Sequence, residues 1–415
     1  MQFIFISITI MYILPLLFKR FRTKVFFTEM VLGVMFTAYL SWLSNNGEHL
    51  FTILIIMLSG VLNIPCISRL LFQSYKWRFV WLIPIVLLFF TSWLLLRSSP
   101  EDISNIIKSG KGSVTYIENN KEVLNIDGHR PQPLASVIKV IVAKEYAHQV
   151  VNQRINPNES VNYDEILKYH LNNTDGGAQA AFEEKYNTNH LTLNDVAKGM
   201  IRYSSNANTD YLIDRLQLDN VNKQIKSLNM KRHSQIYSLI GGMVMASDIS
   251  ERDLSAKITD EQLVKDSIKY KDDYITGKIK EKDVLKKFDM KRQSYWSDHL
   301  THGSTSDYAH LMNDINQDKF NEKETKILRS LMEQIKSQPI KQKYQHYGYK
   351  GGSTAKVING VYYVTEKKNN KRKALAFFLD DLNMWEAYKA QKAMKLFRDK
   401  IFEDEDFRAS LKNIE

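Results

Sequence analysis

A serine and a lysine three residues apart, Ser136 and Lys139, form the first pair in this sequence that could perform chemistry. On a helix this spacing places both side chains on one face. Apolar neighbours surround Lys139, so burial is expected to lower the pKa of its amine toward that of a general base. A second copy of the spacing, Ser353 and Lys356, opens no apolar helix and is better interpreted as the edge of a strand.

A second polar group, Ser204 and Asn206, follows a helical segment that begins at Leu191. Two residues apart at the end of one helix, both side chains could face a cleft. The hydroxyl could then relay a proton and the amide could hold a substrate carbonyl. Taken alone, the group is better interpreted as a polar turn between two helices.

A third group is the run Lys350, Gly351, Gly352 and Ser353, which precedes an apolar segment. Glycines at a strand edge let a substrate backbone approach closely and leave N–H groups free. Lys350 would add positive charge beside the serine. The structural alternative is a glycine turn that enters a strand.

The elements around these groups can be predicted from hydrophobic periodicity. Two alternating segments joined by Asn119 and Asn120 predict a β-hairpin. A long helix is expected to begin at Ala135 and Ser136, and apolar runs predict two further strands. The expected ranges are a hairpin at 113–118 and 121–126, strands at 357–364 and 373–380, and a closing helix from Met384 to Phe402.

The three groups, in this order and in these surroundings, resemble the class A β-lactamase and penicillin-binding-protein family of active-site-serine enzymes. The resemblance covers roughly Ile103 to the C-terminus. It implies an α/β (α+β) fold, in which a five-stranded antiparallel sheet flanked by helices lies beside an all-α lobe. It also implies a serine hydrolase that works through an acyl-enzyme. The roles implied are Ser136 as nucleophile, Lys139 as general base, Ser204 as proton relay, Asn206 and Lys350 at the substrate, and the N–H groups of Ser136 and Ser353 as the oxyanion hole, with Gly351 and Gly352 along the substrate-binding edge.

Three departures from the family pattern bear on function. Gly351 stands where the family usually carries a hydroxyl that grips the substrate carboxylate, so we expect weaker binding of that group. Ser205 stands where the family has Asp. The family's deacylating glutamate has only a partial counterpart, Glu251, whose alternative interpretation is a solvated side chain in a charged turn. The long segment 245–302 is rich in Lys and Asp and is expected to replace the family's usual loop.

The N-terminal part of the chain predicts a membrane anchor. Each of its apolar stretches approaches the length of about 17–25 residues that crosses a bilayer as a helix. Basic residues fill the first and third loops and are absent from the second, which places those two loops in the cytoplasm and the C-terminal part outside. We therefore expect an all-α anchor at 1–98 and an extracytoplasmic hydrolase domain at 99–415, on a bacterial cell membrane. The predicted spans are Phe3–Phe18, Phe26–Leu43, Leu50–Ile67 and Phe79–Leu96.

The charge, the motifs and the cysteine content of the sequence limit the classes of binding partner that we expect. The net charge is +11, but no zinc-finger spacing or RNA-binding aromatic motif accompanies it, so nucleic acid is not expected. Cys66 is the single cysteine, and the sequence predicts neither a metal nor a cofactor. Expected partners are the lipid bilayer and a β-lactam, an envelope peptide or a D-alanyl ester. A β-lactam sensor that is acylated but not turned over is the alternative, although the H-E-x-x-H output motif typical of such receptors is absent from this sequence.

Overall fold

A computed structural model describes residues 97–186, 190–253, 258–335 and 337–412 of the chain. From Ser98 onward, these residues belong to one unit of the chain. The four predicted spans lie outside the described residues. Within the described ranges, no helix combines the length and the hydropathy that crossing a bilayer requires.

The centre of the unit is a five-stranded antiparallel sheet with the order β2-β1-β9-β8-β7. The predicted hairpin is confirmed as β1 and β2, and its turn residues Asn119 and Asn120 have φ of 48° and 68°. Asparagine tolerates this left-handed region better than most residues do. The strands are β1 (Gly112–Glu118), β2 (Lys121–Ile126), β7 (Tyr344–Ser353), β8 (Ile358–Glu366) and β9 (Arg372–Leu379).

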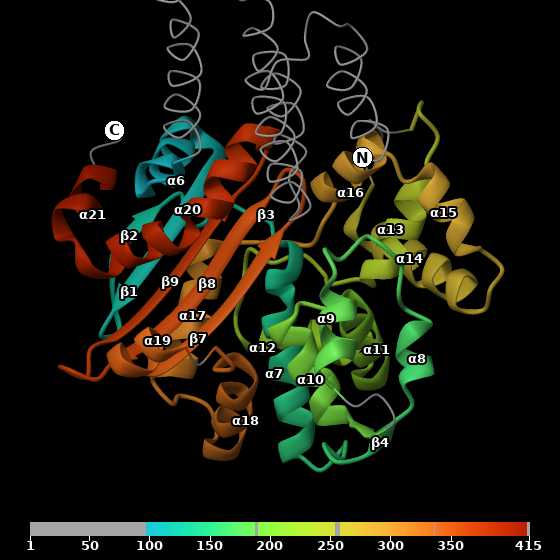
Figure 1. Cartoon of the computed structure of the whole chain (residues 1–415), viewed down its shortest axis with the longest axis horizontal. Helices are drawn as coiled ribbons and strands as arrows, with labels where there is room; N and C mark the ends of the chain where they lie inside the picture. Colours follow the sequence, from blue (N-terminus) through green and yellow to red (C-terminus); the bar gives the residue numbers. More distant parts are fainter. Residues whose placement is uncertain (1–96, 187–189, 254–257, 336, 413–415) are drawn as a thin grey trace, which may run out of the picture. The chain divides into compact units, whose positions relative to one another are not determined.

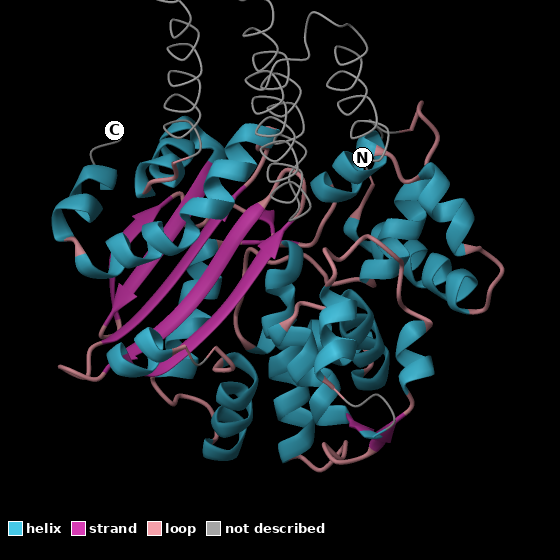
Figure 2. Cartoon of the chain, in the orientation of Figure 1, coloured by secondary structure: helices cyan, strands magenta, loops and turns pink. Residues whose placement is uncertain are grey.

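Helices cover both faces of this sheet (Figures 1 and 2). Strand β9 shows why, because its side chains alternate between two apolar clusters. Ala376 and Phe378 join the cluster that includes α17 (Thr305–Asn316), whereas Leu375 and Phe377 join the one that includes α20. The helices of this second cluster are α6 (Pro100–Ile106), α20 (Met384–Glu403) and α21 (Glu405–Lys412), and α6 continues into a short π-helical turn at Ile107–Lys111.

A helical lobe lies beside strand β7. It begins at the predicted long helix, which is confirmed as a 3-10 turn (Ala135–Ile138) followed by α7. Its other predicted helix is also present but begins at Leu193, not at Leu191, because Leu191 and Thr192 pair as a short strand. Thr192 caps this helix by accepting the N–H of Asp195 in a capping box. The lobe comprises α7 (Lys139–Val151), α8 (Tyr163–Leu167), α9 (Ala178–Lys185), α10 (Leu193–Arg202), α11 (Asn206–Leu216) and α12 (Leu218–Ser227), with α18 (Glu322–Met332) packed against α7.

Segment 245–302, predicted only as a replacement for a loop, folds into helices. The chain leaves α12, forms α13 deep in the lobe, and passes through three more helices before it returns to the sheet at α17. These are α13 (Leu239–Asp248), α14 (Asp260–Ile275), α15 (Glu281–Lys287) and α16 (Met290–Asp298). The short elements that complete the unit are β3 (Gln132–Pro133) paired with β6 (His302–Gly303), β4 (Ser160–Val161) paired with β5 (Leu191–Thr192), and α19 (Gln338–Lys343).

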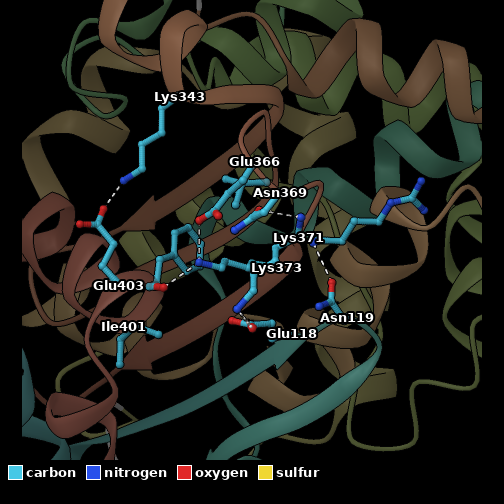
Figure 3. A network of polar contacts seen from close by, with 12 residues as sticks. Glu118, Asn119, Lys343, Glu366, Asn369, Lys371, Lys373, Ile401 and Glu403 are labelled. Carbon is cyan, nitrogen blue, oxygen red and sulfur yellow. Dashed lines mark hydrogen bonds and ion pairs between the residues drawn. The ribbon is translucent and has the colours of Figure 1, made fainter.

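A polar network holds one end of the sheet against the C-terminal end of α20 (Figure 3). The buried amine of Lys373 donates to Glu366 at 2.6 Å and to the Phe402 carbonyl at 2.7 Å. Lys371, the residue before β9, pairs with Glu118 at the end of β1 at 2.9 Å. Because a buried charge is costly unless it is paired, these partners explain how Lys373 is accommodated in a mainly apolar layer.

Candidate active site

Ser136 lies on the 3-10 turn that leads into α7, beside the end of β7. The residue before it, Ala135, has φ of 46°, a left-handed conformation that costs free energy for a non-glycine residue. A β-carbon on Gly352 would lie 2.9 Å from the Ser136 nitrogen and 2.7 Å from the Leu134 carbonyl oxygen. Only glycine therefore allows β7 to approach the serine backbone this closely.

Lys139 is fully buried and its amine meets three residues of the site. The Nζ atom lies 2.9 Å from Ser136 Oγ, which joins the two predicted residues of the first motif. It also lies 2.8 Å from Asn206 Oδ1, 2.5 Å from the Ser204 carbonyl oxygen and 3.2 Å from Ser204 Oγ. The first and second motifs thus converge on one amine.

The turn between α10 and α11 presents Ser204 and Asn206 to that amine. Ser204 has φ of 66°, and this left-handed conformation accompanies the contact of its carbonyl oxygen with Lys139. Ser205, between them, is buried, caps α11 by accepting the N–H of Asn208 at 3.0 Å, and donates its hydroxyl proton to Gln179. The side chain at position 205 therefore has a structural part, which serine fulfils without the family's carboxylate.

Lys350 of β7 is the last of these residues to contact the site. Its Nζ donates to Ser204 Oγ at 2.9 Å and to the Gly351 carbonyl oxygen at 2.6 Å. Ser204 Oγ consequently lies between the amines of Lys139 and Lys350. The structure brings Ser136, Lys139, Ser204, Asn206 and Lys350 together from three separate stretches of the chain; the role of each stays a prediction.

Burial sets the electrostatics of this site. Desolvation lowers the pKa of Lys139 well below its ordinary value, and the nearby charge of Lys350 lowers it further. Desolvation also lowers the pKa of Lys350, to about 7. Both amines contact the same Ser204 hydroxyl, and the charge of Lys350 is one of the causes that favour the neutral form of Lys139. A neutral amine beside a serine hydroxyl is suited to act as a general base.

A cavity of 530 Å³ opens over these residues between β7 and the helical lobe. Ser136, Ser204, Asn206, Lys350 and the run from Gly351 to Ser353 all line it. Strand β7 is an edge strand of the sheet and contacts the 3-10 turn that leads into α7; Figure 1 shows α7 on this side of the sheet. The cavity also continues to the α20 side of β7, where Tyr349 and Gln391 line it.

Asp210 is a residue of the site that sequence reasoning missed. Buried on α11 one turn after Asn206, it accepts the N–H groups of Leu239 at 2.8 Å and Ile240 at 2.6 Å. Desolvation raises the pKa of its carboxyl to about 7, although these two backbone donors oppose the rise. Asp210 thereby fixes the start of α13, whose Leu239 and Met243 line the cavity. Its spacing of four residues from Asn206 was the available signal.

Whether a described carboxylate of the cavity could activate a water near Ser136 depends on what its oxygens already contact. Among the described residues that line the cavity, Asp175 is the one carboxylate, and its two oxygens accept the N–H groups of Gly177 and Gln179 at the start of α9. Glu251 is 68% exposed, pairs with Lys291 at 3.3 Å and does not line the cavity. The structure therefore agrees with the alternative interpretation of Glu251 as a solvated side chain.

The second serine and lysine pair does not form a dyad. Ser353 ends β7 and lines the cavity, whereas the amine of Lys356 donates to Asp298 at 3.0 Å. This agrees with its interpretation as a strand edge. In the described ranges, no group of three or more His, Cys, Asp or Glu side chains is arranged to hold a metal ion.

A helical lobe beside a five-stranded antiparallel sheet, with a serine, two lysines and a second serine in the cleft, defines a serine hydrolase. The sequence matches the beta-lactamase enzyme family over residues 99–402, well over half of the chain. The chain therefore belongs to the beta-lactamase enzyme family, and the predicted enzyme class is confirmed. No curated protein matches the sequence.

Solved structures of class A β-lactamases are similar to this chain at low identity. One from Bacteroides cellulosilyticus is 17% identical with a TM-score of 0.46, covering 74% of this chain and 100% of that one. A β-lactamase from Sphaerobacter thermophilus is 15% identical with a TM-score of 0.46, covering 72% and 96%. A variant of PBP-A, solved as an acyl-enzyme complex with penicillin G, is 16% identical with a TM-score of 0.44, covering 73% and 97%.

Proposed function

We propose that this protein is a membrane-anchored hydrolase whose catalytic domain lies on the outer face of a bacterial membrane. In this proposal Ser136 forms an acyl-enzyme with a β-lactam or with an amide or ester of the cell envelope. The observation that carries the proposal is the buried amine of Lys139, 2.9 Å from Ser136 Oγ and joined through Ser204 to Lys350. Such an arrangement activates a serine without a histidine.

The proposed reaction moves one proton around this constellation. Neutral Lys139 accepts the hydroxyl proton as Ser136 Oγ attacks the substrate carbonyl. The proton then passes from Lys139 to Ser204 Oγ and on to the leaving nitrogen or oxygen, while Lys350 holds Ser204 in place. The backbone N–H groups of Ser136 and Ser353 stabilise the oxyanion, and such donors are each typically worth about 3–4 kcal/mol.

A binding protein that is acylated but not turned over is the second candidate. The observation that favours it is the placement of Asp175, whose two oxygens already accept backbone N–H groups. With Glu251 exposed and outside the cavity, neither carboxylate is placed to activate a water for ester hydrolysis. The two candidates share the acyl-enzyme and differ in the rate at which it is released.

The proposal is tested by intact-protein mass spectrometry of the full-length protein in detergent. After incubation with benzylpenicillin or with a neutral fluorophosphonate, we expect a single adduct of the mass of the reagent's acyl or phosphonyl group. Peptide mapping is expected to place it on Ser136. Absence of an adduct with both reagents at millimolar concentration would contradict the proposed nucleophile.

The pH dependence of labelling follows from the two lysines. Below the lowered pKa of Lys139 its amine is charged and cannot accept a proton, so the rate rises as pH increases through that value. Above about 7, Lys350 loses the charge that attracts an anionic reagent, so the rate with benzylpenicillin falls again. The rising arm approaches a tenfold change per pH unit, because only the neutral amine accepts the proton. The falling arm is shallower, because loss of the Lys350 charge weakens attraction of the reagent without removing the nucleophile or its base.

Second-order labelling rates between pH 5 and pH 9 check this profile. The neutral fluorophosphonate is the control, because it lacks the carboxylate that Lys350 attracts and is expected to show a shallower fall above pH 7. A rate that climbs steadily to pH 10 would instead indicate a lysine base of ordinary pKa.

The proposed location is tested by reporter fusions. Because the basic residues lie in the first and third loops, an alkaline phosphatase reporter fused after Leu96 is expected to be active, and one fused after Lys24 inactive. Fusions of a reporter that fluoresces only in the cytoplasm serve as the reciprocal control. Cytoplasmic fluorescence from a fusion at Ser99 would reverse the proposed orientation.

A further inference from the structure

The cavity carries a hydroxyl that none of the three motifs supplies. Side chains alternate along β7, so Lys350 and Gly352 face Ser204 and Ser136, whereas Tyr349 and Gly351 face the other way. A β-carbon on Gly351 would lie 3.0 Å from Tyr349 Cζ and closer still to its phenol oxygen. The phenol oxygen of Tyr349 thus occupies the space that a side chain at position 351 would fill.

The ring of Tyr349 is held in this place by its neighbours. It stacks on Tyr362 of β8 with ring centroids 4.7 Å apart, and Tyr362 in turn stacks on Phe377 at 6.2 Å. The guanidinium of Arg398 lies 5.5 Å from the Tyr362 ring on the same side of the sheet. A phenol within such a stack loses little additional freedom when its hydroxyl binds a ligand.

The hydroxyl is presented to the cavity rather than sealed in the sheet. Tyr349 is half-buried and lines the same cavity as Ser136 and Lys350. Gln391 and Met394 of α20 line it from this side, so the cavity reaches over the β7 edge. Burial raises the pKa of Tyr349, which keeps the phenol protonated, although a side-chain hydrogen bond with Tyr362 opposes the rise. In that bond the Tyr349 oxygen acts as the acceptor, so its own proton is left to donate.

The charges around the hydroxyl favour an anionic partner. The amine of Lys350 donates to the Gly351 carbonyl oxygen at 2.6 Å, and the phenol oxygen of Tyr349 lies against the α-carbon side of the same residue. Arg202 is a second cation among the residues that line the cavity, against the single carboxylate of Asp175. A protonated phenol and a lysine amine on neighbouring residues of one strand edge together suit the recognition of a carboxylate.

We propose that the Tyr349 hydroxyl donates a hydrogen bond to a carboxylate of the substrate at the edge of β7, in the space that Gly351 leaves open. This inference rests on the proposed function and deepens it. It also replaces the expectation from the sequence that Gly351 leaves the substrate carboxylate poorly paired. Tyr349, two residues before Gly351 on the same face of β7, supplies the hydroxyl. Glycine is required at position 351 because any side chain there would displace the phenol of Tyr349.

The test measures non-covalent binding, so that it does not depend on acylation. In full-length protein carrying Ser136→Ala, calorimetric titration gives the Kd of benzylpenicillin and of its methyl ester, which lacks the carboxylate charge. Adding Tyr349→Phe keeps the ring and removes only the hydroxyl. We expect this change to weaken benzylpenicillin binding roughly tenfold and to leave methyl ester binding within about twofold.

The matched control is Tyr344→Phe, which removes another phenol oxygen from the same strand at a position that does not line the cavity. It is expected to change neither Kd. A rescue pair guards against loss of packing: Tyr349→Ala is expected to weaken benzylpenicillin binding, and Tyr349→Ala with Gly351→Thr to recover most of it. Thermal unfolding of each variant verifies that the domain remains folded.

The outcomes separate this inference from the proposed function. Equal weakening of acid and ester by Tyr349→Phe, or no weakening of either, would overturn the inference and leave the acyl-enzyme proposal standing. Failure of wild-type protein to form an adduct, together with a selective effect of Tyr349→Phe on the acid, would overturn the proposed function and leave the carboxylate site standing. No saturable binding of benzylpenicillin to the Ser136→Ala protein would contradict the inference.

Discussion

Replacing Ser136 by alanine is expected to abolish covalent labelling by both benzylpenicillin and a fluorophosphonate. The change removes the oxygen that forms the ester while Lys139, Ser204 and Lys350 keep their mutual contacts. Loss of a nucleophile that acts as a unit with its base typically costs about 10⁴-fold or more. Gel fluorescence and intact mass after an hour of incubation measure the remaining adduct.

Ser353→Ala is the matched control for this loss. Ser353 lines the same cavity and precedes a lysine at the same spacing, but that lysine pairs with Asp298 and does not reach a serine. Its backbone N–H also survives the substitution, so we expect labelling within about threefold of wild type. Labelling that persists in Ser136→Ala and disappears in Ser353→Ala would identify Ser353, and not Ser136, as the nucleophile.

The features that could be predicted from the sequence are those that depend only on residues close together in the chain. The pairing of Ser136 with Lys139 is a property of one helical turn, and the turn residues Asn119 and Asn120 mark their hairpin without help from distant residues. The order of the three motifs then supplied the long-range part, because the family's fold brings them together.

The features that could not be predicted from the sequence depend on contacts between distant segments. Asp210 is an ordinary polar residue on a helix until α13, some thirty positions later, supplies the backbone N–H groups that it accepts. Segment 245–302 is rich in Lys and Asp, and this composition alone does not indicate a packed structure. In the structure, α13 and α14 contact each other and bury side chains, so the segment packs as part of the lobe.

Tyr349 was overlooked for a different reason. The family pattern places a hydroxyl at position 351, so Gly351 by itself predicts that this hydroxyl is missing. The alternation of side chains along a strand places residue 349 on the same face as residue 351, which makes a replacement from that position geometrically reasonable. The structure adds that Tyr349 stacks on Tyr362 and that its phenol oxygen lies where a β-carbon of residue 351 would be.

Slow release of the acyl group is the second effect that we expect to be large. An ester on Ser136 is stable unless a base within hydrogen-bond reach activates a water. The described part of the cavity offers Asp175 alone, and the capping of α9 occupies both of its oxygens. General-base assistance is typically worth 10²–10⁴-fold, so hydrolysis of the acyl-enzyme is expected to be slower by about that factor than in an enzyme with a poised carboxylate.

Stopped-flow measurements with nitrocefin at substrate excess test this expectation in the full-length protein. We expect a burst of about one equivalent of opened lactam, set by acylation, followed by a much slower steady phase, and intact mass spectrometry should show nearly complete acylation during that phase. Glu251→Gln, which alters an exposed carboxylate outside the cavity, is the control and should leave both phases unchanged. Sustained turnover without a burst would contradict the expectation, and its loss in Asp175→Asn would then identify Asp175 as the water-activating base. The steady rate therefore separates an acylated binding protein from a hydrolase that clears its ester.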